Sequence, residues 1–195
     1  MSVLRLKLPT DPRWVNIVET NIEEILTDHA FCEQKAATNA ITIVVKFPEK
    51  TDLVTAMLAL AQEELSHFQQ VHQKLIERGF TLGKERRDEY VNLLYAFQRK
   101  GGSREVHLID RLLFGAMIEA RSCERFKVLS DNINDADLRD FYRMLMVSEA
   151  NHYTTFLSFA HQYAGNEDVD KRWQEWLDYE GEIIKGFGVK ETIHG

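Results

Sequence analysis

Cysteine, glycine and proline are all scarce in this sequence, and each scarcity narrows the class of protein. The two cysteines, Cys32 and Cys123, are too few for a disulfide scaffold or a thiolate metal site. We interpret both as small buried hydrophobic residues in a reducing compartment. With 10 Gly and 3 Pro in 195 residues, the composition is typical of a helix-rich globular protein and unlike a disordered or fibrous chain.

Long apolar runs and an excess of positive charge are also missing. No apolar run reaches the roughly 18 residues that a membrane span needs, and the opening MSVLRLKLPTDPRW lacks the apolar stretch of a signal peptide. We therefore predict a cytoplasmic protein that does not associate with membranes. The net charge of -7 argues against a general affinity for polyanions, so any nucleic acid would have to bind a local patch.

Apolar residues recur at intervals of three and four along four long segments, which is the pattern of amphipathic helices. The predicted long helices cover about 14–46, 52–79, 104–131 and 135–164. The run AITIVVKF is the one β-like stretch, and we assign it to the end of the first helix. A shorter helix at about 168–185 is expected to pack on the outside.

The lengths of the connections predict how these helices are arranged. The first and second helices, and the third and fourth, are joined by short loops, which indicates two antiparallel hairpins. Residues 80–103 form a long crossover between them, within which DEYVNLLYAFQR is a candidate short helix. We predict an all-α protein of a single domain, 1–195: a ferritin-like four-helix bundle plus a C-terminal helix.

Ionisable residues interrupt each apolar stripe, and they do so in a repeated pattern. One helix of each hairpin carries a single glutamate and the other carries Glu-x-x-His, which places both side chains on one helix face. The first glutamate precedes the second by 31 residues in one hairpin and by 30 in the other. The six residues are Glu33, Glu64, His67, Glu119, Glu149 and His152.

Burying carboxylates is costly unless they bind a positive group. Four carboxylates and two imidazoles at one level of a bundle are the ligand set of di-iron and di-manganese proteins, and oxygen with nitrogen ligands suits either metal. For any single residue, an ordinary hydrogen-bonded pair in a metal-free scaffold is the better interpretation. Six residues in repeated register favour a site for two divalent cations.

Neighbouring ionisable residues are weaker candidates for this site. We expect Glu63 to be solvated and Glu124 to form an ion pair. His29 lies one helical turn before Glu33, where it either supports the ligands or is an ordinary core histidine.

Several of these segments resemble a known family. LLFGAMIEARSCERF (112–126) and FYRMLMVSEANHY (141–153) are similar to the MiaE-type tRNA hydroxylases, as are DHAFCEQKAA (28–37) and EELSHF (63–68). The resemblance covers about residues 8–165. It implies a non-haem di-iron monooxygenase that hydroxylates the isopentenyl chain of methylthio-isopentenyl-adenosine, next to the anticodon of certain tRNAs, with the six residues above as iron ligands.

As a hypothesis for the mechanism, two iron ions (Fe2+/Fe3+) activate O2, with Glu64 and Glu149 bridging the metals and Glu33 and Glu119 as terminal ligands. The sequence has neither a Gly-rich dinucleotide fingerprint nor a cysteine cluster for iron–sulfur. We therefore expect a separate electron-transfer partner.

A local cluster of positive charge lies in and beside the crossover. Between residues 84 and 111 there are seven Lys or Arg against five Asp or Glu, interleaved with aromatic residues. Cations and aromatic rings are what single-stranded RNA loops bind. By composition alone an ordinary solvated connector is favoured, whereas the family resemblance favours a tRNA anticodon-loop contact. The candidate contact residues are Arg86, Arg87, Arg99 and Lys100.

The same six ligands would also suit a ferritin-like protein that oxidises or stores iron without an organic substrate. Iron storage needs a closed shell of many subunits, while a hydroxylase works as a monomer or small homo-oligomer. We predict a monomer or small homo-oligomer.

Overall fold

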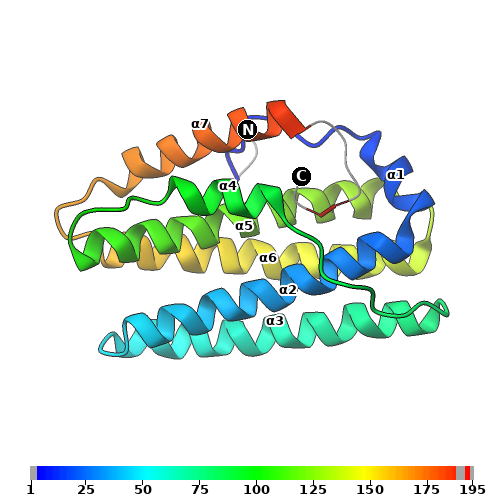
Figure 1. Cartoon of the computed structure of the whole chain (residues 1–195), viewed down its shortest axis with the longest axis horizontal. Coiled ribbons are helices and arrows are strands. Elements are labelled where there is room, and N and C mark those ends of the chain that lie inside the picture. The colour runs from blue at the N-terminus through cyan, green and yellow to red at the C-terminus, as the bar shows by residue number, and fades with distance from the viewer. Residues whose placement is uncertain (1–3, 188–191, 194–195) are drawn as a thin grey trace. The chain divides into compact units, whose positions relative to one another are not determined.

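The computed structural model describes residues 4–187, 192 and 193, with Phe187 described by its backbone only. These residues form seven α-helices and no strand, in agreement with the all-α prediction. The helices are α1 (Trp14–Thr20), α2 (Ile22–Lys46), α3 (Thr51–Glu77), α4 (Glu89–Phe97), α5 (Arg104–Asn132), α6 (Ala136–Gln162) and α7 (Val169–Phe187) (Figure 1). None of the helices in these described ranges combines the length and the apolarity needed to cross a membrane.

The described chain divides into two compact units, each built on one of the predicted hairpins. Residues 20–87 with 192–193 contain α2 and α3, and we call them the α2–α3 unit. Residues 4–19 with 88–187 contain the other helices, and we call them the α5–α6 unit. The single domain stays a prediction.

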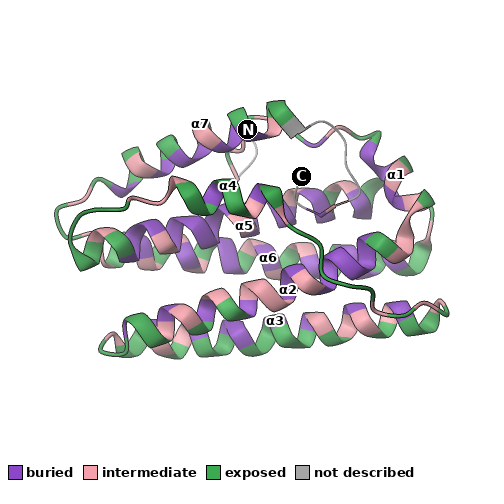
Figure 2. Ribbon diagram, viewed as in Figure 1, coloured by how far each residue is buried: buried purple, intermediate pink, exposed green. Residues whose placement is uncertain are grey.

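In the α2–α3 unit the two helices lie side by side as an antiparallel hairpin (Figure 1). The turn between them begins at Phe47, whose N–H donates to the carbonyl of Ile43, and contains Pro48, which cannot continue a helix. AITIVVKF ends α2 as predicted. The apolar stripes of the two helices are buried, while the outward face of α3 is exposed (Figure 2).

The prediction of one continuous helix over 14–46 is wrong at Asn21, where α1 ends and α2 begins. Asn21 has φ -138° and ψ 43°, outside the helical region, and its side-chain amide donates to the hydroxyl of Thr20 at 3.0 Å. Asparagine forms such local hydrogen bonds at the expense of helix, which accounts for the break. The apolar periodicity continues across it and so gives no signal.

In the α5–α6 unit the hairpin is fixed by two N-caps. The side chains of Ser103 and Asp135 accept hydrogen bonds from the N–H groups of Val106 and Leu138, which satisfies donors that a helix start leaves open. Helix α5 is buried along most of its length, because α6, α4 and α7 all pack against it (Figure 2). The candidate short helix in the crossover is confirmed as α4, and the outer C-terminal helix as α7.

A buried ion-pair network holds the outer layer of this unit onto α5. The guanidinium of Arg121 is fully buried and donates to the carboxylate of Glu180 in α7, at 2.8 Å from Nε and 2.5 Å from Nη2. It also donates to Glu124 and to the backbone carbonyl of Leu8, and the hydroxyl of Tyr90 in α4 donates to Glu180. Arg121 of α5 therefore binds α7 and the segment at Leu8 directly, and α4 joins the network through Glu180.

Candidate functional site

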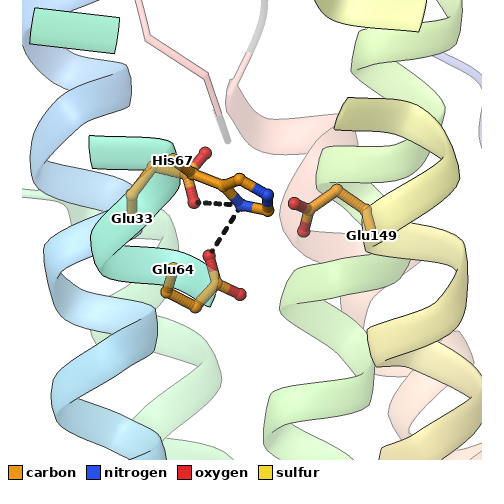
Figure 3. Close-up of side chains that lie close together, drawn as sticks. All are labelled: Glu33, Glu64, His67 and Glu149. Atoms are coloured by element: carbon orange, nitrogen blue, oxygen red, sulfur yellow. Dashed lines mark hydrogen bonds and ion pairs between the residues drawn. The ribbon is translucent and has the colours of Figure 1, made fainter. Parts of the chain in front are cut away.

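The α2–α3 unit brings three of the predicted ligands together. Glu33 comes from α2, Glu64 and His67 come from α3, and all three are buried. Each offers one ligand atom within 4.8 Å of the others, and we call this group the α2–α3 triad. Nδ1 of His67 lies 3.3 Å from Oε2 of Glu64 and 3.8 Å from Oε2 of Glu33 (Figure 3). Figure 3 also draws Glu149 of α6.

The charges of this triad are strongly coupled. Burial would raise the pKa of Glu33, but interactions with His29 and His67 outweigh it and hold that pKa well below its usual range. Burial would lower the pKa of His67, yet the carboxylates of Glu33 and Glu64 raise it to about 10. Without a metal, the triad therefore holds a proton on His67 at neutral pH.

His29 is fully buried and contacts the triad through Glu33. Its Nε2 lies 2.6 Å from Oε1 of Glu33, one helical turn further along α2. The sequence left two interpretations of this histidine open, and the structure places it in direct hydrogen-bond contact with a predicted ligand.

The α5–α6 unit holds the other three predicted ligands in the same arrangement. Glu119 comes from α5, and Glu149 and His152 come from α6; all are buried, with ligand atoms within 4.8 Å of one another. We call this group the α5–α6 triad. The two helices approach closely beside it, since a Cβ added to Gly115 would lie 2.8 Å from the ring of Phe156. A glycine at this position lets a phenyl ring pack directly on the helix backbone.

Cys123 lies near the α5–α6 triad without belonging to it. Burial, together with the charges of Glu149 and Glu124, raises the pKa of this thiol to about 11, so it is protonated at neutral pH. Its Sγ donates to the carbonyl of Met146 at 3.4 Å. Both cysteines are free and buried, as the sequence indicates.

The donor set of each triad suits a divalent metal. Two carboxylates and one imidazole supply the oxygen and nitrogen ligands that iron and manganese accept, and the two negative charges match one divalent cation. Because such charges are costly to bury alone, a bound cation also accounts for their position in the core. The residues present therefore fit one metal ion per triad.

The predicted RNA contacts differ in their surroundings. Arg86, Arg87 and Lys100 are exposed. Arg99 is half-buried and donates to Asp110 at 3.1 Å and to Glu167 at 2.6 Å, so its charge is already compensated within the α5–α6 unit. Arg99 has a structural role that the sequence pattern does not indicate.

The weaker ligand candidates behave as expected from the sequence. The side chain of Glu63 is half exposed, and its nearest oxygen lies 3.9 Å from Nε2 of His67. Glu124 accepts hydrogen bonds from Arg121 and from both the backbone N–H and the hydroxyl of Thr10. Glu124 is thus part of the ion-pair network on the outer side of α5.

Comparisons with known proteins give a consistent result. Residues 2–195 match the family described as tRNA-(MS[2]IO[6]A)-hydroxylase (MiaE). A protein of Pseudomonas putida named tRNA 2-(methylsulfanyl)-N(6)-isopentenyladenosine(37) hydroxylase is 38% identical over 164 residues, covering 84% of this chain and 78% of that protein. A protein of the same name from Salmonella typhimurium is 30% identical, covering 92% of this chain and 83% of the relative.

A solved structure is similar along almost the whole chain. It is described as Protein 43 with aldehyde deformylating oxygenase activity from Synechococcus, with a TM-score of 0.90 and 31% sequence identity. The likeness covers 97% of this chain and 95% of that one. It confirms the ferritin-like fold class that the sequence predicts.

Proposed function

Because the chain belongs to the tRNA-(MS[2]IO[6]A)-hydroxylase (MiaE) family, we propose that it hydroxylates the isopentenyl group of methylthio-isopentenyl-adenosine in tRNA. The two relatives named above carry this substrate in their names and align with most of the chain. Since the substrate is tRNA, we infer a cytoplasmic location.

The repeated triad is the structural observation that supports this function. We propose that the α2–α3 triad and the α5–α6 triad would each hold one of two iron ions. The geometry inside each hairpin supports one iron ion per triad, because each unit supplies two buried carboxylates and one imidazole. Bound iron would supply the activation of O2 that insertion into a C–H bond requires.

The chain's own groups hold the site and its charge. The four carboxylates would compensate the positive charge of two divalent ions, and a metal ion held by the α2–α3 triad would displace the proton of His67. In the net reaction a C–H bond of the substrate becomes C–O–H, and the second oxygen atom of O2 leaves as water. Two electrons and two protons are consumed, and we propose that the electrons come from a separate donor protein.

The tRNA contacts are proposed from the exposed cations near the crossover. Arg86, Arg87 and Lys100 are exposed and suited to phosphate contact. Arg99 is the weaker candidate, because its guanidinium is bound by two carboxylates.

Family membership favours the hydroxylase over an iron-storage protein with the same ligands. The two functions differ in assembly, so gel filtration distinguishes them. We expect a monomer or small homo-oligomer, whereas a large cage would favour storage.

Nucleoside analysis of cellular tRNA tests the proposed function. Cells that lack the gene should lose the hydroxylated methylthio-isopentenyl nucleoside and accumulate its precursor, as measured by mass spectrometry. A plasmid carrying the wild-type gene should restore the hydroxylated nucleoside. Glu119→Gln should not, whereas the control Glu105→Gln, at an exposed position of the same helix, should. An unchanged nucleoside profile in the deletion strain would contradict the proposal.

A further inference from the structure

His29 is a buried polar side chain with an unassigned role next to a predicted iron ligand. It is fully buried in α2, and its Nε2 lies 2.6 Å from Oε1 of Glu33. An ionised carboxylate only accepts hydrogen bonds, so Nε2 carries the hydrogen and donates it. The short distance is typical of a strong, charge-assisted hydrogen bond.

This contact gives the two oxygens of Glu33 different surroundings. Oε1 faces His29, whereas Oε2 lies 3.8 Å from Nδ1 of His67, another predicted ligand. Oε1 is engaged by His29, whereas Oε2 is the oxygen that faces His67 and thus the rest of the triad. Glu33 is therefore arranged to offer one oxygen to a metal ion.

The turn of α2 that carries His29 is fixed from outside the helix. The hydroxyl of Thr27 accepts a hydrogen bond from the N–H of Gly83 at 3.3 Å. The carboxylate of Asp28 is buried and accepts one from the N–H of Ile193 at 2.7 Å. Both contacts lie within the α2–α3 unit, and they hold this turn in place independently of any metal.

We propose that His29 is a positioning residue that holds Glu33 as a single-oxygen ligand of the iron bound by the α2–α3 triad. This inference rests on the proposed iron centre. Groups that hydrogen-bond to metal ligands fix the ligand's orientation, and their loss lowers metal affinity by about 10–100-fold. A purely space-filling histidine would have no such effect.

Three substitutions separate the hydrogen bond from the volume of the side chain. His29→Gln retains a donor long enough to reach residue i+4, His29→Asn has a donor that is too short, and His29→Leu has none. The readouts are anaerobic Fe(II) titration of the whole chain and Mössbauer spectra of the loaded protein. Circular dichroism of the metal-free variants reports on folding.

We expect wild type and His29→Gln to bind two irons with similar affinity and similar spectra. His29→Leu and His29→Asn should bind one of the two irons about 10–100-fold more weakly, with a changed spectrum for that iron. If His29→Leu does not fold, the difference in iron affinity between His29→Asn and His29→Gln tests the same role of the hydrogen bond.

Equal iron binding and unchanged spectra in the asparagine and glutamine variants would overturn the role of His29 while leaving the iron centre intact. Weak binding by both, in folded protein, would also overturn it, because the imidazole would then be needed for another reason. A wild-type chain that binds no Fe(II) would instead refute the proposed centre itself. The two failures are therefore distinguishable.

Discussion

At the scale of single residues, the site depends on how buried charges are compensated. His67 lies between two carboxylates that raise its pKa to about 10, and one of them, Glu33, is also held by His29. In the metal-free protein the protonated imidazole compensates these carboxylates, and a metal ion held at the proposed site would take over that role. Metal binding and proton release at this triad are therefore linked.

The linkage predicts a pH dependence of metal affinity. Below pH 10 the metal-free protein holds a proton on His67 that must leave when the imidazole binds a metal. The apparent affinity for the metal at the α2–α3 triad should therefore rise with pH, by about tenfold per unit for this one proton. Anaerobic Fe(II) titrations between pH 6.5 and 8, with calorimetry in buffers of different ionisation enthalpy, measure both the affinity and the released proton.

His67 also makes the stability of the metal-free protein depend on pH, but in the opposite direction: stability falls as the pH rises, whereas metal affinity increases. The unfolded pKa of histidine, about 6.5, lies below the folded value, so the contribution to stability is complete below pH 6.5 and disappears as the pH rises through about 10. The iron titrations provide the decisive test of the affinity prediction. An iron affinity that does not change with pH would contradict it, because His67 would then already be neutral without metal.

Sequence reasoning could predict which residues meet within each hairpin, because helical periodicity and a short turn place one glutamate opposite Glu-x-x-His. It could not resolve the role of His29, since a core histidine and a ligand-supporting one occupy the same stripe. Nor could it show that Arg99 is bound by Asp110 and Glu167, because the second partner lies 68 residues away and follows no periodic pattern.

At the scale of helices, α5 and α6 are fixed against each other beside the second triad. Gly115 lies one turn before Glu119, Phe156 lies one turn after His152, and the phenyl ring packs on the glycine. The position of these two ligands therefore depends on the separation of the helix axes. The sequence predicted both helices, but not that this glycine sets their distance.

Gly115→Ala should disturb this contact. The new methyl group would lie 2.8 Å from the ring of Phe156, so the ring or the helix has to move. Overpacking of this kind costs about 1–3 kcal/mol, and we expect a lower unfolding midpoint together with weaker Fe(II) binding.

Urea denaturation and anaerobic iron titration measure the two effects. The control is Gly101→Ala, where the added methyl group has no neighbour within 4 Å. Wild-type stability and iron content in the Gly115 variant would mean that the helix pair tolerates a wider spacing than the structure indicates.

The break at Asn21 is the other lesson at this scale. Apolar periodicity predicted one helix across it, because periodicity reports which face is buried and not whether the backbone is continuous. The break is instead associated with the local hydrogen bond from Asn21 to Thr20, which does not change the apolar pattern.

At the scale of the whole molecule, an acidic chain has to bind a polyanion. With a net charge of -7, long-range attraction to tRNA is absent, so binding depends on a few exposed cations. The candidates are Arg86, Arg87 and Lys100, while Arg99 is engaged within the protein.

Neutralising these cations should change the salt dependence of tRNA binding. Each of Arg86→Gln, Arg87→Gln and Lys100→Gln should weaken binding and reduce the slope of log affinity against log salt by about one. Arg99→Gln should mainly lower the unfolding midpoint, since it removes ion pairs with Asp110 and Glu167.

Filter-binding or fluorescence titrations over a range of KCl concentrations measure the slopes. Lys127→Gln, an exposed lysine already paired with Asp131, is the control and should leave the slope unchanged. If Arg86→Gln, Arg87→Gln and Lys100→Gln all keep the wild-type slope, the RNA surface lies elsewhere on the protein.

The hydrogen bond from Ile193 to Asp28 joins residues 165 positions apart in the chain. During synthesis on the ribosome, α2 and α3 are complete long before Ile193 has been translated. The carboxylate of Asp28 therefore has to wait, in solvent or with a temporary partner, until Ile193 emerges. The hairpin that is translated first thus acquires this contact long after its two helices are complete.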